Sequence, residues 1–182
     1  MATYNGVSYV ETQLKSILCQ LARDDELILV DDHSQDLTVD LIKSLGDTRI
    51  KIYQNKCNEG VLKTFERAIR LSSGDVIFLS DQDDVWYPKK VARISDVFRH
   101  QPDVTLVMSD ANYIDDKGKV FHSSFVALRG GFKGGLLPNI IKNRYLGCSL
   151  AFRRTIVNKF LPFPPDIPMH DVWIGCINAI YG

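Results

Sequence analysis

The segment of this sequence best suited to chemistry is residues 80–86, Ser-Asp-Gln-Asp-Asp-Val-Trp, which places three aspartates within four residues. Carboxylates this close repel one another and lose hydration on burial, unless a cation or hydrogen-bond donors compensate them. A hard divalent ion such as Mg²⁺ compensates them, because it binds one or two carboxylates and leaves other positions for phosphate oxygens. The alternative is an acidic surface turn in which Asp84 caps the following helix.

The neighbouring sequence places these aspartates at the end of a strand. The apolar run 76–79 is typical of a buried strand, and the apolar spacing from Val91 to Phe98 predicts a helix that begins near Pro88. Open α/β sheets bind their ligands outside the carboxyl ends of their strands. The acidic segment is therefore expected at a ligand-binding edge.

A second polar loop follows the first predicted strand. Thr3 and Asn5 can hydrogen-bond to a nucleobase there, while the ring of Tyr4 can stack on it. The alternative is ordinary turn chemistry for the Asn-Gly pair.

A third polar loop follows the predicted strand 27–30. One carboxylate of the pair Asp31 and Asp32 can accept the imide hydrogen of a uracil or thymine ring, and the other can support the loop. Ser34 or Asp36 can cap the next helix at the same time.

A fourth loop contains Asn58 and Gly60 and opens the following helix. Lys63, one turn further on, can approach a base or a phosphate, although a solvated lysine is an equally good interpretation.

Apolar segments with helix and strand periodicity alternate along the chain. A helix carrying Leu37, Leu41, Ile42 and Leu45 follows the second strand, and a last helix begins at about Asp171. Strands are expected at 1–3, 27–30, 50–53, 76–79, 104–108 and 147–152. Repeated βαβ units imply an α/β fold with a central, mainly parallel sheet flanked by helices.

The segment 129–144 is rich in glycine, with apolar residues between basic ones. It predicts either a short helix that faces the core or an apolar, basic lip that meets an acceptor or a membrane surface.

Composition narrows the class of protein. The 182 residues suit one domain, and the 22 basic and 22 acidic residues cancel, so no overall charge favours nucleic acid. No apolar run approaches the roughly 20 residues of a membrane-spanning helix, and no secretory signal is recognisable. The four cysteines lack metal-ligand spacing and are expected to be reduced structural thiols in a cytoplasmic protein.

Taken in order, these motifs resemble those of family 2 glycosyltransferases, and the resemblance covers nearly the whole chain. Ser-Asp-Gln-Asp-Asp-x-Trp, followed by a proline and a lysine, is similar to the rhamnosyltransferase-like branch that builds bacterial surface polysaccharides. The other matching motifs are Met-Ala-Thr-Tyr-Asn-Gly at 1–6, Asp31-Asp32-x-Ser34, Asn58-x-Gly60, Gly147-Cys148-Ser149 and His170-Asp171-x-Trp173.

The resemblance implies a Rossmann-like GT-A domain. Its nucleotide-sugar-binding half would span about 1–110 and its acceptor half about 111–182, with the domain truncated at both ends. The implied reaction is metal-dependent transfer, with inversion, from dTDP-rhamnose or a UDP-sugar to a saccharide or lipid-linked acceptor. The implied cofactor is Mg²⁺ or Mn²⁺, and peripheral contact with the inner face of the plasma membrane is compatible with this role.

The resemblance also assigns roles to individual residues. Asp83 matches the metal-contacting end of the family's Asp-x-Asp and Asp81 its first member, while Asp84 would be an additional contact to metal, ribose or loop. Asp32 and Tyr4 match the residues that contact the base. Asp171 falls where the family keeps its general base, although it could also cap the last helix. The remaining donor-binding residues would be Thr3, Asn5, Asn58, Gly60, Lys63 and Asp81 itself.

Three other functions compete with this interpretation. A nucleotidyltransferase would need a glycine- and arginine-rich phosphate loop, and residues 3–10 contain no arginine or lysine. A non-catalytic module that binds a sugar nucleotide or a glycan is the second. Hydrolysis by paired carboxylates would leave the nucleotide-type loops without a purpose.

Overall fold

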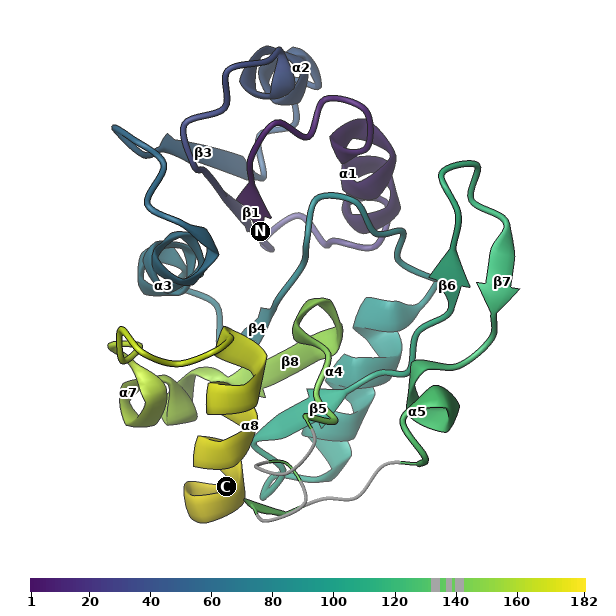
Figure 1. The fold of residues 1–182 in the computed structure, drawn as a ribbon, viewed down its shortest axis with the longest axis vertical. Helices are drawn as coiled ribbons and strands as arrows, with labels where there is room; N and C mark the ends of the chain where they lie inside the picture. The colour runs from purple at the N-terminus through teal and green to yellow at the C-terminus, as the bar shows by residue number, and fades with distance from the viewer. Residues whose placement is uncertain (132–134, 137–138, 140–142) are drawn as a thin grey trace.

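The computed structural model describes residues 1–131, 135–136, 139 and 143–182. Three parallel strands form its N-terminal part (Figure 1). They are β1 (Ala2–Thr3), β2 (Leu27–Asp31) and β3 (Ile50–Gln54), with β2 in the middle. Every residue of β2 is buried, as expected for a parallel strand covered on both faces.

Helices cover the two faces of this sheet. On one face, α1 (Val10–Leu18) and α2 (Thr38–Ser44) pack against Leu27 and Leu29. On the other, α3 (Val61–Leu71) places Ala68 against Ile28 and Val30. Because successive side chains of a strand point to opposite faces, β2 contributes residues to two separate apolar cores, one on each face of the sheet.

A second sheet has the order β4-β8-β5 and is antiparallel. β4 (Val76–Phe78) and β5 (Leu106–Met108) both pair with β8 (Leu150–Arg153), which lies between them. The expected strand 147–152 thus begins later, because Gly147–Ser149 forms a 3-10 turn, η1. A strand from the C-terminal part of the chain is therefore the middle strand of this second sheet, and it runs antiparallel to both of its neighbours.

The C-terminal elements enclose the main apolar core. They are η2 (Arg154–Ile156), α7 (Val157–Phe160) and α8 (His170–Tyr181). Phe152 of β8 meets Phe160 edge to face, with ring centroids 5.2 Å apart. The same core includes Phe65 of α3 and Ile174 of α8, and it joins the two halves of the chain.

Helix α4 (Lys90–His100) covers the second sheet through Ile94 and Phe98. The hairpin of β6 (Tyr113–Ile114) and β7 (Val120–His122) projects beside it (Figure 1). α5 (Phe125–Leu128) then begins at its cap Ser124.

The prediction of an apolar, basic lip concerns residues that lie largely outside the described part of the chain. Among the helices that the structure describes, none has the length and apolar character needed to span a membrane.

Three expected helix details are wrong. Leu37 precedes α2 and is 67% exposed, because the helix begins at Thr38, whose backbone N–H donates to Asp36. Asp84 does not cap α4, since the N-cap is Lys89. Asp171 is not an N-cap either. It lies inside the first turn of α8, after the N-cap Met169.

Candidate active site

The loop after β1 is tied to the loop after β2 by backbone and side-chain hydrogen bonds. Asn5 adopts a positive φ of 47°, which asparagine tolerates better than most residues. Its backbone N–H donates to Ser34 Oγ at 2.9 Å, and its Oδ1 accepts from the Gln35 N–H at 2.8 Å. Asn5 therefore holds the loop after β1 against the loop after β2.

Asp31 and Thr3 are buried and partner each other. Thr3 Oγ1 donates to Asp31 Oδ2 at 3.0 Å, and Ser34 donates to the same carboxylate through its backbone N–H and its hydroxyl. The structure thus places the hydroxyl of Thr3 on a buried carboxylate below the loops.

Asp32 holds the loop between β3 and α3. Its Oδ1 accepts from Asn55 Nδ2 at 2.7 Å and from the Glu59 N–H at 2.8 Å, and its Oδ2 accepts from the Gly60 N–H at 2.9 Å. Burial acts to raise the pKa of Asp32, but these hydrogen bonds outweigh it and hold the pKa below its usual value. The sequence predicts that one of Asp31 and Asp32 contacts the base and that the other supports the loop. In the structure both carboxylates accept hydrogen bonds from loop residues, so their contacts do not distinguish these two roles.

Other predicted donor residues surround this scaffold. Gly60 has a φ of 87°, which favours glycine, and it is followed directly by α3. The side chains of Asn58 and Lys63 are exposed, and the ring of Tyr4 is 45% exposed. These groups remain accessible to a ligand.

Gln82 connects the acidic loop to the first loop, a role that no motif in the sequence predicted. Its amide pairs with both backbone groups of Tyr4: Oε1 accepts from the N–H at 2.9 Å, and Nε2 donates to the carbonyl at 3.0 Å. A Cβ on Gly6 would lie 2.2 Å from Gln82 Oε1, so glycine is needed there for close approach. From the other side, Gln13 of α1 donates to Ser80 Oγ at 2.8 Å.

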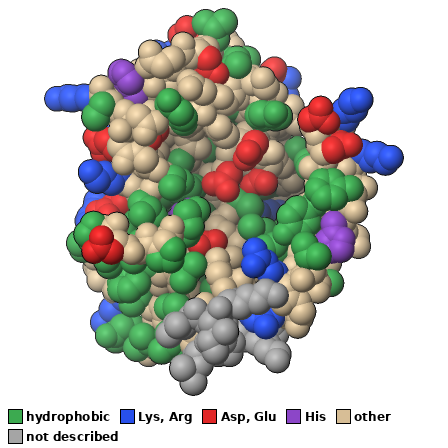
Figure 2. Space-filling model, in the orientation of Figure 1, with side chains coloured by type: hydrophobic (Ala, Val, Ile, Leu, Met, Phe, Trp, Pro, Cys, Tyr) green, Lys and Arg blue, Asp and Glu red, His purple; other side chains and the backbone are tan. Residues whose placement is uncertain are grey.

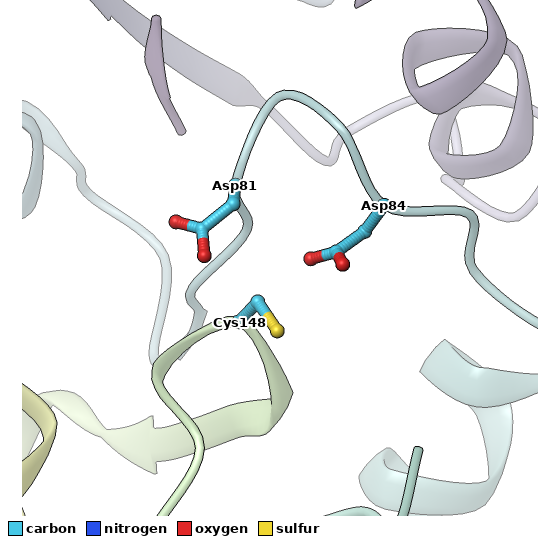
Figure 3. Close-up of side chains that lie close together, drawn as sticks. All are labelled: Asp81, Asp84 and Cys148. Carbon is cyan, nitrogen blue, oxygen red and sulfur yellow. The ribbon is translucent and has the colours of Figure 1, made fainter. Parts of the chain in front are cut away.

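Asp81, Asp84 and Cys148 lie close together below the acidic loop (Figure 3). One ligand atom from each lies within 4.8 Å of the others. Asp83, the predicted partner of Asp81, is exposed on the same loop. Cys148 comes from η1, so the second half of the chain supplies part of the cluster, and one of the expected structural thiols lies in the site.

Burial is the largest cause of the raised pKa values of Asp81, Asp84 and Cys148. Burial raises the pKa of Asp81 to about 7, and the charges of Asp84 and Asp83 add to the effect. Burial likewise raises the pKa of Asp84 and of the Cys148 thiol. Lys90 compensates in part: its Nζ donates to the Cys148 carbonyl at 3.1 Å, and burial lowers its pKa.

These side chains fit a divalent cation. Oδ2 of Asp84 is buried without a hydrogen-bond partner among the described residues, which is costly for a carboxylate oxygen. Two carboxylate groups at this spacing suit Mg²⁺ or Mn²⁺, and a thiol is a ligand for softer ions.

Asp171 approaches the same cluster from α8. It is buried, and its Oδ1 accepts from the Val172 N–H at 2.6 Å. Its charge contributes to the raised pKa of Asp81, so the two carboxylates are close enough to interact. Trp173 anchors the helix, because its Nε1 donates to the Phe160 carbonyl at 2.9 Å.

A cleft of about 740 Å³ opens beside Asp84 and Cys148, a size typical of ligand sites. Figure 2 shows acidic side chains gathered in the middle of this face, next to a hollow with hydrophobic side chains on its other side. The walls of the cleft include Tyr87, Asn112 and Val120.

Comparison with solved structures identifies the fold. The chain is similar to the mannosyltransferase PcManGT of Pyrobaculum calidifontis in complex with GDP-Man and Mn²⁺, with a TM-score of 0.70 and 21% identity over 94% of this chain and 48% of that one. It is also similar to S. aureus TarS 1–349 in complex with UDP-GlcNAc, with a TM-score of 0.73 and 16% identity over 98% and 51% of the two chains. The fold is that of GT-A glycosyltransferases.

The sequence comparisons then show the family. The family model for glycosyl transferase family 2 matches residues 1–161, so the chain belongs to this family. It is 31% identical to an uncharacterized glycosyltransferase of Nostoc sp. over 97% of its own length and 56% of that protein.

Two further relatives carry more specific names. The UDP-Glc:alpha-D-GlcNAc-diphosphoundecaprenol beta-1,3-glucosyltransferase WfgD of Escherichia coli is 28% identical over 90% of this chain and 62% of its own length. The dTDP-rhamnosyl transferase RfbG of Shigella flexneri is 38% identical over 53% of this chain and 36% of its own length. The chain therefore spans less than two thirds of each of these relatives.

The contact between Gly6 and Gln82 predicts energetic coupling. Gly6→Ala should lower the free energy of unfolding by about 1–2 kcal/mol, because the new Cβ displaces the Gln82 amide from Tyr4. In a Gln82→Ala background the same change should cost almost nothing. Urea denaturation of the four proteins measures this coupling, and equal costs in both backgrounds would contradict it.

The raised pKa of Asp81 predicts a pH dependence of stability in metal-free protein. The unfolded chain releases this proton near pH 4 and the folded chain at about pH 7, so stability should fall as the pH rises between these values, by up to about 4 kcal/mol. Asp81→Asn should lack this loss. Urea denaturation in EDTA from pH 4 to pH 8 tests it. A constant difference between wild type and variant would show that Asp81 titrates normally.

Proposed function

We propose that this chain transfers a sugar from a UDP-sugar or dTDP-rhamnose to a saccharide or lipid-linked saccharide acceptor, with inversion at the anomeric carbon and with Mg²⁺ or Mn²⁺. The observation that carries the proposal is the cluster of Asp81, Asp84 and Cys148 beside the loops of the parallel sheet, with Asp171 lying next to Gly147, the neighbour of Cys148. The names of two relatives, one using UDP-Glc and one dTDP-rhamnosyl, support this choice of donors.

In the proposed complex, the nucleotide lies over the loops after β1, β2 and β3. The exposed ring of Tyr4 is placed to stack on the base, and Asn58 and Lys63 are accessible to base or phosphate. We assign recognition of the base to Asp32, which would have to accept an additional hydrogen bond beside those that fix the loop. Thr3, Asn5 and Gly60 shape the loops.

Asp81 and Asp84 would hold the divalent ion, with Asp83 as a further contact from the same loop. When bound, the ion supplies positive charge that stabilises the leaving diphosphate. Lys90, which lies against this cluster, adds a second positive charge. The positive charge that faces the diphosphate would thus come from the ion and from Lys90.

Asp171 is proposed as the general base that takes the proton of the acceptor hydroxyl. Its place in the first turn of α8 and the hydrogen bond from the Val172 N–H fix its carboxylate. The adjacent cleft offers room for a saccharide next to the carboxylates.

A single displacement is proposed because the cluster offers no activated nucleophile. Cys148 is the thiol beside the carboxylates, and burial together with Asp84 and Asp81 raises its pKa, so it stays protonated near neutral pH. Direct attack by the acceptor inverts the anomeric centre. We further propose that the reaction takes place at the cytoplasmic face of the membrane, which the diphosphoundecaprenol acceptor named for the E. coli relative supports.

The test combines calorimetry with turnover. UDP or dTDP should bind more tightly with Mn²⁺ or Mg²⁺ than without, and Asp84→Asn should remove most of this gain, on the order of tenfold or more. Asp171→Asn should keep nucleotide binding but lower turnover by about 10²–10⁴-fold.

Asp116→Asn is the matched control, because it removes an exposed aspartate from the β6–β7 turn. Comparison with Asp83→Asn shows which aspartate partners Asp81. Loss of nucleotide binding in Asp171→Asn would contradict its assignment as the base. Metal-dependent binding without turnover of any donor would favour the non-catalytic binding module.

A further inference from the structure

Helix α8 is held against the segment before β8 by two contacts between a ring and a glycine. The ring of Tyr145 lies where a Cβ on Gly175 would be, with its Cδ2 and Cε2 at 2.1 Å from that position. In the opposite sense, Nε2 of His170 lies 2.6 Å from the position of a Cβ on Gly147. Each of the two elements thus supplies one ring and one glycine, and each ring contacts the glycine of the other element.

Both glycines are needed for close approach and not for backbone conformation, because neither has a positive φ. Gly175 lies in the interior of α8, where glycine costs roughly 0.5–1 kcal/mol relative to alanine. A helix that accepts this cost gains closer packing against its neighbour. The rings themselves are well held: Tyr145 is buried, and His170 lies on Phe65 with centroids 4.3 Å apart.

The two contacts join the elements that carry the reacting groups. Gly147 is adjacent to Cys148, and His170 is adjacent to Asp171. The contact between His170 and Gly147 therefore sets how closely the first turn of α8 approaches η1. It thereby also sets the distance between Asp171 and the cluster of Asp81 and Asp84. The electrostatic effect of Asp171 on Asp81 agrees with such a close approach.

His170 contributes its ring without using its nitrogens. Both ring nitrogens are buried and have no hydrogen-bond partner among the described residues, and burial lowers the pKa of the imidazole. The ring acts here as a flat body between Phe65 and Gly147.

We infer that the contacts of His170 with Gly147 and of Tyr145 with Gly175 position Asp171 for catalysis. His170 and Tyr145 are thus positioning residues of the active site. This inference rests on the proposed function, because it takes Asp171 as the general base.

The experiment compares Gly147→Ala and Gly175→Ala with Gly74→Ala, whose new Cβ would meet its nearest neighbour, the Val76 carbonyl oxygen, at 3.5 Å. Two quantities are measured for each: the Kd for UDP with Mn²⁺, and kcat for release of the nucleotide from UDP-glucose and dTDP-rhamnose with a GlcNAc-diphosphoundecaprenol acceptor, the acceptor class named for the E. coli relative. Both site variants should lose at least about tenfold in kcat, since displacing a catalytic group by about 1 Å can cost 10²-fold. Their Kd should stay within about twofold of wild type, and Gly74→Ala should match wild type in both.

A second pair of variants keeps the test decisive if either glycine variant fails to fold. His170→Ala removes the ring without a clash and should lower kcat at unchanged Kd. His170→Phe keeps the ring and should restore kcat to within about threefold of wild type, with a higher Tm because two unpartnered nitrogens are no longer buried.

The outcomes separate the inference from the proposed function. Folded glycine variants with the kcat of wild type would overturn the inference, as would a parallel loss of kcat and nucleotide affinity. A His170→Phe variant as slow as His170→Ala would overturn it too, because the nitrogens and not the ring would then matter. If the wild type binds UDP with Mn²⁺ but turns over neither donor, the proposed function fails first and the inference falls with it.

Discussion

The pairing of β8 with β4 and β5 is the interaction on which the site depends. Leu79 donates its N–H to the Leu150 carbonyl at 2.9 Å, and Ser109 donates to the Ser149 carbonyl at 3.1 Å, so β8 is held at the end where the acidic loop begins. The turn η1 directly precedes β8 and is thereby fixed below that loop. Without this pairing, Cys148 and Asp171 would have no defined position relative to Asp81.

The loops of the parallel sheet show how buried carboxylates can serve a ligand site indirectly. Asp31 and Asp32 accept hydrogen bonds from three loop segments, and Gln82 links the acidic loop to the backbone of Tyr4. Groups held in this way lose little further conformational freedom when a ligand binds. The exposed ring of Tyr4 is thus presented by a rigid framework.

The acidic cluster has the opposite character, because it is destabilised in the absence of positive charge. Burial and mutual repulsion raise the pKa of Asp81, and one oxygen of Asp84 has no partner among the described groups. Lys90 lies against the cluster but does not neutralise it fully. A divalent ion with a diphosphate would relieve this repulsion, so the energetic cost of the cluster is itself an argument for the proposed donor site.

The sequence by itself determined the α/β class, the position of most strands and helices, and the loops that carry polar residues, because these follow from local periodicity and from turn chemistry. It also marked residues 80–86 and Asp171 by their motifs. Only the tertiary structure decided that Asp84 and Cys148 lie beside Asp81, that Thr3 and Asp32 support loops, and that Gln82 bridges two of them. These outcomes depend on contacts between segments as much as 78 residues apart in sequence. The local sequence pattern does not determine which distant residues come into contact. The antiparallel entry of β8 has the same origin, since strand pairing is set by the packing of the whole core and not by the strand's own residues.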